Sequence, residues 1–282
     1  MTDSSTEQNE HAGGEPQQQD KAGSLRTIML VASILCLLAG LGLGLLALAG
    51  PLAVWMGMAD FRLGFGFLQI VNSWADWIAA ITLLTAVAIF VIGRQKQEAD
   101  STRLGVLALV GAISAGLAWY VPETFRPPEG TPPIHDIATD PYNPLPYVAI
   151  APIRADAANN MDYGVMDGID SVQQHIDLQV EAYPDIVPQT FNDSVDAVFN
   201  RALDAVQAMG WELVDADPQS GRIEATDTTF WFRFKDDVVI QIASNAAGET
   251  ELQARSLSRV GRSDVGKNAE RLREFFALMN NG

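Results

Sequence analysis

Apolar residues are distributed in two different ways along the chain. In the first 122 residues they form long runs, of which Thr27–Ala49 and Leu104–Val121 contain no charged residue at all. A helix of about 20 residues is roughly 30 Å long, which matches a hydrocarbon core, so such runs are typical of membrane spans. The pattern predicts a membrane region over residues 26–122 with three transmembrane helices, at about 27–49, 74–92 and 104–121.

Polar and proline-rich segments separate these spans from the rest of the chain. Residues 1–25 contain no large aliphatic residue before Leu25, so they have little to bury and are predicted to form a disordered tail. Gly50–Phe67 mixes charges with apolar residues and is predicted to be a short interfacial connection. Four prolines in residues 123–133 predict an extended linker, which leaves residues 134–282 for a soluble domain.

The soluble part combines helical and strand patterns. Val195–Met209 has apolar residues at helical spacing and is expected to be capped by Asn192 or Asp193, and a last helix is expected at about Asp264–Met279. Alternating segments between them predict strands at Trp211–Ala216, Arg222–Thr228, Phe230–Phe234, Val238–Ala243 and Glu251–Val260. Consecutive strands with short turns favour an antiparallel sheet that helices cover, so the predicted fold class is α+β in two layers.

The charge balance narrows the function classes. The chain has 35 acidic and 18 basic residues, for a net charge of −17. We expect no nucleic-acid binding, because phosphate contacts need clustered Lys and Arg. The single cysteine, Cys36, lies in the first apolar run, so neither a disulfide framework nor a cysteine zinc site is expected.

Basic residues beside the spans predict the orientation, because cytoplasmic loops carry an excess of Lys and Arg. Five lie on the amino-terminal side and two on the other: Lys21, Arg26, Arg94, Lys96 and Arg103 against Arg62 and Arg126. We therefore expect a multi-pass protein of the cell inner membrane with a cytoplasmic amino terminus. The carboxy-terminal domain would then lie in the periplasm.

The soluble part resembles a known family over nearly all of residues 134–279. The similarity is carried, in this order, by Ile134-His135-Asp136-Ile137, Thr139-Asp140, Tyr183-Pro184-Asp185, Gly221–Thr228, Phe234–Val238 and Arg255–Asn268. These segments resemble the bacterial and plastid family catalogued as domain of unknown function 1499. Lys267 departs mildly from the family, which usually has Ala or Val there. The resemblance implies a shared fold and often a membrane-anchored context, but no activity, substrate or catalytic residue.

The densest group of polar residues lies in the segment Arg255–Asn268. Strand alternation places Arg255 and Arg259 on one face, and Arg262 follows in the turn before the last helix. The candidate residues for binding an anion or another ligand are Arg255, Ser258, Arg259, Arg262, Asp264 and Asn268. Guanidinium groups beside a helix amino terminus can hold a phosphate or carboxylate, because free N–H groups point there.

A structural interpretation of the same segment stays open. In an acidic domain the arginines can pair with carboxylates, for which the candidate partners are Glu224, Asp227, Asp236 and Asp237. Ser263 or Asp264 would then cap the last helix. Asp236 and Asp237 could also act as acid and base or as calcium ligands, but the pair is more simply interpreted as a turn between two strands.

Other signals for specific chemistry are weak. Gly261-x-x-x-x-Gly266-Lys267-Asn268 lacks the hydroxyl of a phosphate-binding loop, and too little chain follows for the required parallel sheet. His135 and His175 have no metal-ligand spacing, so no metal and no cofactor are expected. Aromatic residues near Trp231 could line an apolar pocket, although core positions are the simpler explanation.

Gly40-x-x-x-Gly44 in the first span allows helices to approach closely. It would serve either packing among the three spans or a homodimer formed through Gly40 and Gly44.

These observations favour a non-enzymatic binding or interaction module of the cell envelope. Its expected partners are the lipid bilayer and either an envelope protein or a small anionic ligand. The alternative is a hydrolase-like enzyme that acts on an envelope component through Asp236, Asp237, Asp264 and the arginines.

Overall fold

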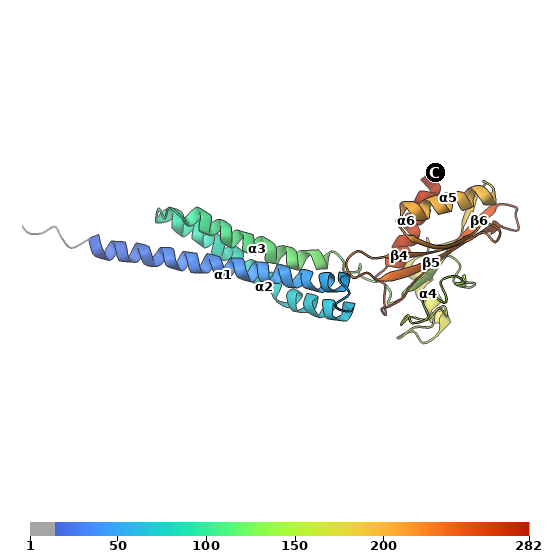
Figure 1. Ribbon diagram of the computed structural model, residues 1–282, viewed down its shortest axis with the longest axis horizontal. Coiled ribbons are helices and arrows are strands. Elements are labelled where there is room, and N and C mark those ends of the chain that lie inside the picture. Colours follow the sequence, from blue (N-terminus) through green and yellow to red (C-terminus); the bar gives the residue numbers. More distant parts are fainter. Residues whose placement is uncertain (1–14, 282) are drawn as a thin grey trace, which may run out of the picture. The chain divides into compact units, whose positions relative to one another are not determined.

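A computed structural model describes residues 15–281 of the chain, which divide into two compact units between Phe125 and Arg126. The first unit contains three long helices: α1 (Glu15–Trp55), α2 (Phe61–Gln95) and α3 (Ser101–Glu123) (Figure 1). All three are long and apolar enough to cross a membrane. The prediction of three membrane-spanning helices is therefore confirmed at the level of length and composition.

The helices are longer than the predicted spans. α1 begins at Glu15, so residues 15–25 are helical instead of belonging to a disordered tail, and the first 14 residues lie outside the described residues. α1 also continues through Pro51, which leaves only residues 56–60 as the connection to α2. An apolar surrounding offers a backbone no other hydrogen-bond partner, which favours helix even around a proline.

Small residues bring the helices of the first unit together. Gly40 packs against the backbone of Gly111 in α3, where a side chain would collide. Ser114 in α3 donates a hydrogen bond to the carbonyl oxygen of Gly40 at 3.0 Å, and its hydroxyl also lies beside Gly44. Gly40 and Gly44 therefore face a neighbouring helix of the same chain, as packing among the spans requires.

The second unit is built on one antiparallel sheet. Its strands are β1 (Asp136–Ala138), β2 (Gln189–Phe191), β3 (Glu212–Asp217), β4 (Arg222–Thr228), β5 (Lys235–Ser244) and β6 (Thr250–Ser258). The order across the sheet is β1-β6-β5-β4-β3, and β2 pairs with the other half of β6. This arrangement makes β6 the strand that joins distant parts of the chain.

Three helices complete the second unit: α4 (Val172–Ala182), α5 (Val195–Ala208) and α6 (Lys267–Asn281). Figure 1 shows α5 and α6 on one face of the sheet and α4 beyond the other face. The predicted α+β fold class is confirmed, with an antiparallel sheet covered by helices.

Several local predictions are wrong. Phe230–Phe234 is the turn between β4 and β5 and not a strand, while Asp236 and Asp237 lie inside β5 and not in a turn. The cap of α5 is Ser194, whose Oγ accepts a hydrogen bond from the backbone N–H of Ala197 at 3.3 Å. For the two aspartates, tertiary ion pairs with Arg271 and Arg259 override the local pattern.

The two faces of the sheet hold different cores. Alternate residues of β5 point to opposite sides, so Ile240 belongs to the main core with Phe275 of α6, whereas Val239 packs with Tyr147 and Leu257 on the other face. An irregular segment that includes Tyr147 covers this second face. The charged residues of the candidate site are divided between these two faces.

Candidate functional site

Asn268 lies at the centre of the polar group on the helix side of the sheet. It is fully buried in α6, and its amide nitrogen donates to the carbonyl of His135 at 2.9 Å and to the hydroxyl of Ser258 at 3.0 Å. Its Oδ1 accepts from the hydroxyl of Ser256 and from Arg271, both at 2.6 Å. The amide therefore uses its full hydrogen-bonding capacity to join α6 to β6 and to the chain before β1.

Arg271 supplies the positive charge of the polar group on the helix side of the sheet. It is not among the candidate residues that the sequence indicates. Its guanidinium donates to Asp227 at 2.8 Å and to Asp236 at 2.6 Å. Burial alone would lower the pKa of Arg271, but attraction first by Asp236 and then by Asp227 outweighs it and raises the pKa. Two of the predicted carboxylate partners thus meet an arginine outside the predicted segment.

Asp264 caps α6 from the preceding turn. Its two carboxylate oxygens accept hydrogen bonds from the backbone N–H groups of Gly266 and Asn268, each at 2.8 Å. Burial raises the pKa of Asp264 to about 6, against the opposing effect of these two hydrogen bonds. This geometry is that of the structural interpretation, in which Asp264 satisfies a helix end.

Arg255 lies on the other face of the sheet and is buried. It pairs with both carboxylate oxygens of Asp136, at 2.9 and 2.7 Å, and donates to the carbonyl oxygens of Leu145 and Met161 at 2.8 and 2.7 Å. Its guanidinium also lies 5.1 Å from the ring centre of Tyr147. Burial opposes the charge, but Asp136 outweighs it and raises the pKa of Arg255. Every side of this cation is occupied by the domain itself.

Asp237 gathers the remaining charges of that face. It is fully buried and accepts two hydrogen bonds from Arg259, at 2.9 and 2.8 Å, and one from Thr226 at 2.8 Å. Arg154 approaches the same carboxylate at 3.1 Å. The pairing of Arg259 with Asp237 is one that the structural interpretation anticipates.

Glu224 fastens the covering segment to the sheet. Its carboxylate accepts hydrogen bonds from the backbone N–H groups of Val148 and Ile150 and from Arg222, each at 2.7 Å. The four predicted carboxylates therefore all act inside the domain, two on each face. Asp136 and Arg154 complete the arrangement, and only the fold could identify them, because they are distant in sequence from their partners.

Arg262 differs from the other predicted arginines. It is exposed, and no ion pair or hydrogen bond joins its side chain to any other part of residues 15–281. Its guanidinium lies beside Gly168, where an added Cβ would come within 2.9 Å of Nη2. Gly168 has a φ of +85°, so a side chain at this position would also strain the backbone.

Arg262 lines an open cavity of about 420 Å³. The irregular segment before α4 forms most of its wall, and the polar or charged residues that line it are His135, Asn159, Asn160, Asp167, Asp170, Ser171 and Arg262. Asn159 is held in place, because its amide nitrogen donates to the carbonyl oxygens of Ser258 and Gly261 at 3.0 and 2.9 Å. Ser171 is the cap of α4, so a helix amino terminus reaches the cavity as well.

His135 is the buried polar residue of this cavity. Its side chain is 3% exposed, and its Nδ1 is enclosed with no hydrogen-bond partner among the described residues. Burial lowers its pKa, with Asp136 opposing, so the imidazole is neutral at pH 7. An enclosed ring nitrogen without a partner carries a desolvation cost that packing alone does not explain.

The second histidine, His175, does not line the cavity but lies next to Gly164 of its wall, and both of its ring nitrogens also lack a hydrogen-bond partner among the described residues. It is fully buried in α4 and meets the ring of Tyr163 edge-on, with 4.6 Å between ring centres. Within residues 15–281 no three His, Cys, Asp or Glu side chains come together in a way that could hold a metal ion.

A model of the family described as "Protein of unknown function (DUF1499)" matches residues 136–279, from the first residue of β1 into α6. The match includes every buried ion pair of both faces and the whole cavity wall except His135. No curated protein matches the chain.

Proposed function

The chain belongs to the DUF1499 family of proteins of unknown function, and we propose that it is a membrane-anchored binding module that is not an enzyme. Its ligand site is the cavity beside His135 and Arg262. The ligand is small and carries one anionic group, which meets the guanidinium of Arg262. The three apolar helices hold this domain at the cell inner membrane, and the domain faces the periplasm.

The observation that carries the proposal is the contrast between Arg262 and its neighbours. Arg255 and Arg259 are fully engaged by Asp136 and Asp237, whereas Arg262 has no acidic partner within residues 15–281. It shares its cavity with His135, whose ring nitrogen lacks a partner. A cation that forms no ion pair and an unsatisfied buried polar group in one cavity are what a ligand would complete.

The charges around the cavity limit the ligand further. Asp167 and Asp170 also line it, and the domain as a whole is strongly acidic. Both features disfavour ligands with several negative charges, such as phosphate esters. They favour a ligand with a single carboxylate that also carries an ammonium or hydroxyl group, from which the two aspartates can accept a hydrogen bond.

The hydrolase alternative has weaker support. It requires Asp236, Asp237 or Asp264 to meet a substrate, but each of them is buried and already accepts hydrogen bonds from the domain. Displacing those donors to free a carboxylate would leave buried charges unpaired, which costs several kcal/mol. A binding role needs no such rearrangement.

A thermal-shift screen of the full chain in lipid nanodiscs tests the proposal. Acetate, lactate, glycine and serine serve as probes that each carry one carboxylate, with an ammonium group as well in the two amino acids, and inorganic phosphate serves as the more highly charged comparison. A probe at about 100 times its Kd stabilises the folded state by roughly 2.7 kcal/mol. We expect at least one of the four carboxylates to raise the Tm of the wild-type protein and to lose this effect in Arg262→Gln.

The matched control is Lys267→Gln, which removes an exposed cation of the same segment that lies outside the cavity. It should keep the shift. The proposal is wrong if none of the four carboxylates raises the Tm, or if Arg262→Gln responds as strongly as the wild-type protein does.

A further inference from the structure

The turn between β4 and β5 carries an unusual concentration of aromatic residues. Residues 230–234 read Phe-Trp-Phe-Arg-Phe. The base of the turn is closed by Thr229, whose backbone N–H donates to the carbonyl of Phe234 at 2.8 Å and whose hydroxyl accepts from the N–H of Phe234 at 2.9 Å. The turn is therefore a defined structure and not a loose loop.

The tip of this turn exposes apolar surface. Phe230 is 66% exposed and touches Trp231 edge-on at 5.2 Å between ring centres, while Phe232 stacks on Phe234 at 5.9 Å. Arg233 holds a φ of +54°, a conformation that costs free energy for any residue except glycine. Exposed apolar surface on a strained tip is suited to a contact outside the domain.

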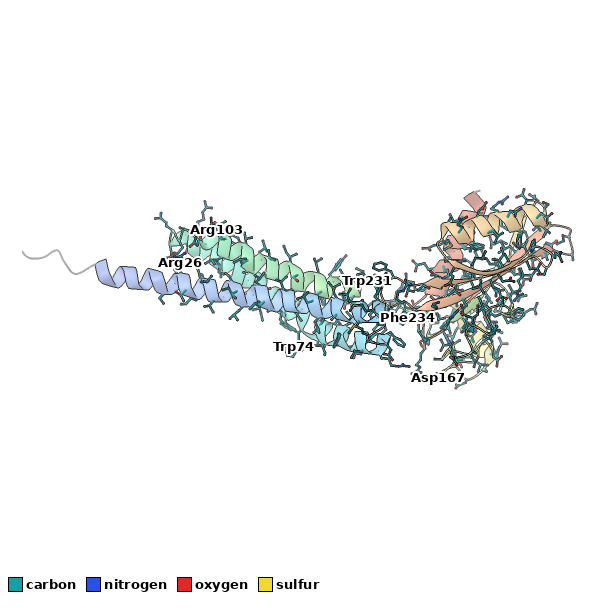
Figure 2. The ribbon with its side chains drawn as sticks, viewed as in Figure 1. Arg26, Trp74, Arg103, Asp167, Trp231 and Phe234 are labelled. Atoms are coloured by element: carbon teal, nitrogen blue, oxygen red, sulfur yellow. The ribbon has the colours of Figure 1, made fainter. Side chains whose placement is uncertain are left out.

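The register of the sheet shows at which end of the domain this tip lies relative to the linker. Thr228 pairs with Lys235, Asp236 with Ser258, and Leu257 with Asp136, the first residue of β1. The aromatic turn and the point where the chain enters β1 from the linker thus lie at the same end of the sheet. Figure 2 labels Trp231 and Phe234 at that end.

The bilayer is the partner that these facts favour. The chain between α3 and β1 spans residues 124–135, and at about 3.5 Å per extended residue it can reach roughly 40 Å at most. A domain on so short a tether meets lipid at a high effective concentration. Trp and Phe beside basic residues are typical of membrane interfaces, and the turn carries the exposed Arg233 at its tip, while Lys235 at its base lies 3.7 Å from Glu212.

We propose that the tip Phe230–Arg233 inserts into the interfacial layer of the bilayer in which the same chain is anchored. The insertion orients the domain with the linker end of the sheet toward the lipid. It is independent of ligand binding in the cavity, since none of these residues lines it.

Site-specific fluorescence tests the insertion, because Cys36 is the single cysteine of the chain. In a Cys36→Ser background, Phe230→Cys is labelled with a polarity-sensitive fluorophore, and the full chain is placed in nanodiscs with or without nitroxide-labelled lipids. Tyr142→Cys is the matched control: Tyr142 is 72% exposed and lies beyond the opposite end of β1. Ala247→Cys, in the exposed turn between β5 and β6, gives a second reference.

We expect the label at position 230 to emit at shorter wavelength and to be quenched by the nitroxide lipids several-fold more than at positions 142 and 247. Equal quenching at all three positions would overturn the proposal. A blue-shifted label at position 230 that the lipids do not quench would also overturn it, because the tip would then be covered by protein.

Discussion

At the scale of single residues, the domain converts most of its charge into internal ion pairs. Arg255 and Asp136 are both buried, and their bidentate geometry is the form in which an arginine and a carboxylate interact most strongly. Such a pair contributes little net stability compared with apolar packing, but breaking it leaves one charge buried without its partner. The consequence can be measured directly.

We predict that Asp136→Asn destabilises the soluble domain by about 3–5 kcal/mol. Arg255 would keep its two carbonyl acceptors but lose its counter-charge. The midpoint of urea unfolding, followed by near-UV circular dichroism of the full chain, reports the change. Lys267→Gln breaks only the exposed pair with Glu270 and should cost less than about 1 kcal/mol. A wild-type midpoint for Asp136→Asn would contradict a structural role for Arg255.

Residue patterns in the sequence could predict part of this network. The placement of Arg255 and Arg259 on one face follows from strand alternation, and the pairing of Arg259 with Asp237 was among the expected partners. Asp136 as the partner of Arg255 was not among them, because 119 residues separate the two in sequence. Only the pairing of β1 with β6 brings them together.

At the scale of elements, the sequence pattern predicts the start of α6 correctly but fails at the start of β5. The apolar spacing predicts the last helix, and of the two cap candidates, Ser263 and Asp264, the structure shows Asp264. Asp236 and Asp237 are interpreted from the sequence as a turn because they lie between two predicted strands, and because adjacent residues of a strand would point to opposite faces. They lie inside β5 because each has an arginine on its own face of the sheet, Arg271 and Arg259.

Two further segments cannot be identified correctly from their local sequence patterns. α4 buries His175 and Gln179 along with Ile176, so its buried face is partly polar and lacks the apolar periodicity of an ordinary surface helix. The turn at residues 229–234 has the alternation of a strand, since its aromatic rings are spaced by two, but its tip is exposed. In this turn, therefore, the alternation of aromatic residues does not mark a half-buried strand.

The cap of α6 predicts a pH dependence. The pKa of Asp264 is about 6 in the folded state and 3.8 as a model value, so the folded protein binds this proton more tightly than the unfolded chain does. The resulting stabilisation is complete below about pH 4 and is lost as the pH rises through about 6. Asp264→Asn removes this titration.

We therefore expect the wild-type protein to lose stability relative to Asp264→Asn between about pH 4 and pH 6, by an amount on the order of 3 kcal/mol. Urea midpoints of both proteins at several pH values in this interval measure the difference. A difference that stays constant with pH would show that Asp264 does not titrate as its burial requires.

At the scale of the whole molecule, three apolar helices and an acidic domain share one chain. The excess of basic residues beside the spans predicts that the acidic domain lies in the periplasm. Alkaline phosphatase fused after Gly282 should then be active, and the same enzyme fused at Gln97, between α2 and α3, should be inactive. The reverse pattern of activities would contradict the proposed orientation.

The central claim is that ligand binding takes place in the cavity beside His135 and Arg262. The chain has only three histidines, so nitrogen-15 labelling of histidine gives few ring signals. His175 is buried and is not among the lining residues, but it lies next to Gly164 of the lining, so Arg262→Gln and not His175 serves as the control. The most direct measurement is the NMR titration of these ring nitrogens with acetate, lactate, glycine and serine.

We expect at least one of these four compounds to shift the His135 signals in a saturable manner in the wild-type protein and to have no such effect in Arg262→Gln. His135 signals that respond to none of them, or that respond equally in Arg262→Gln, would contradict binding in this cavity.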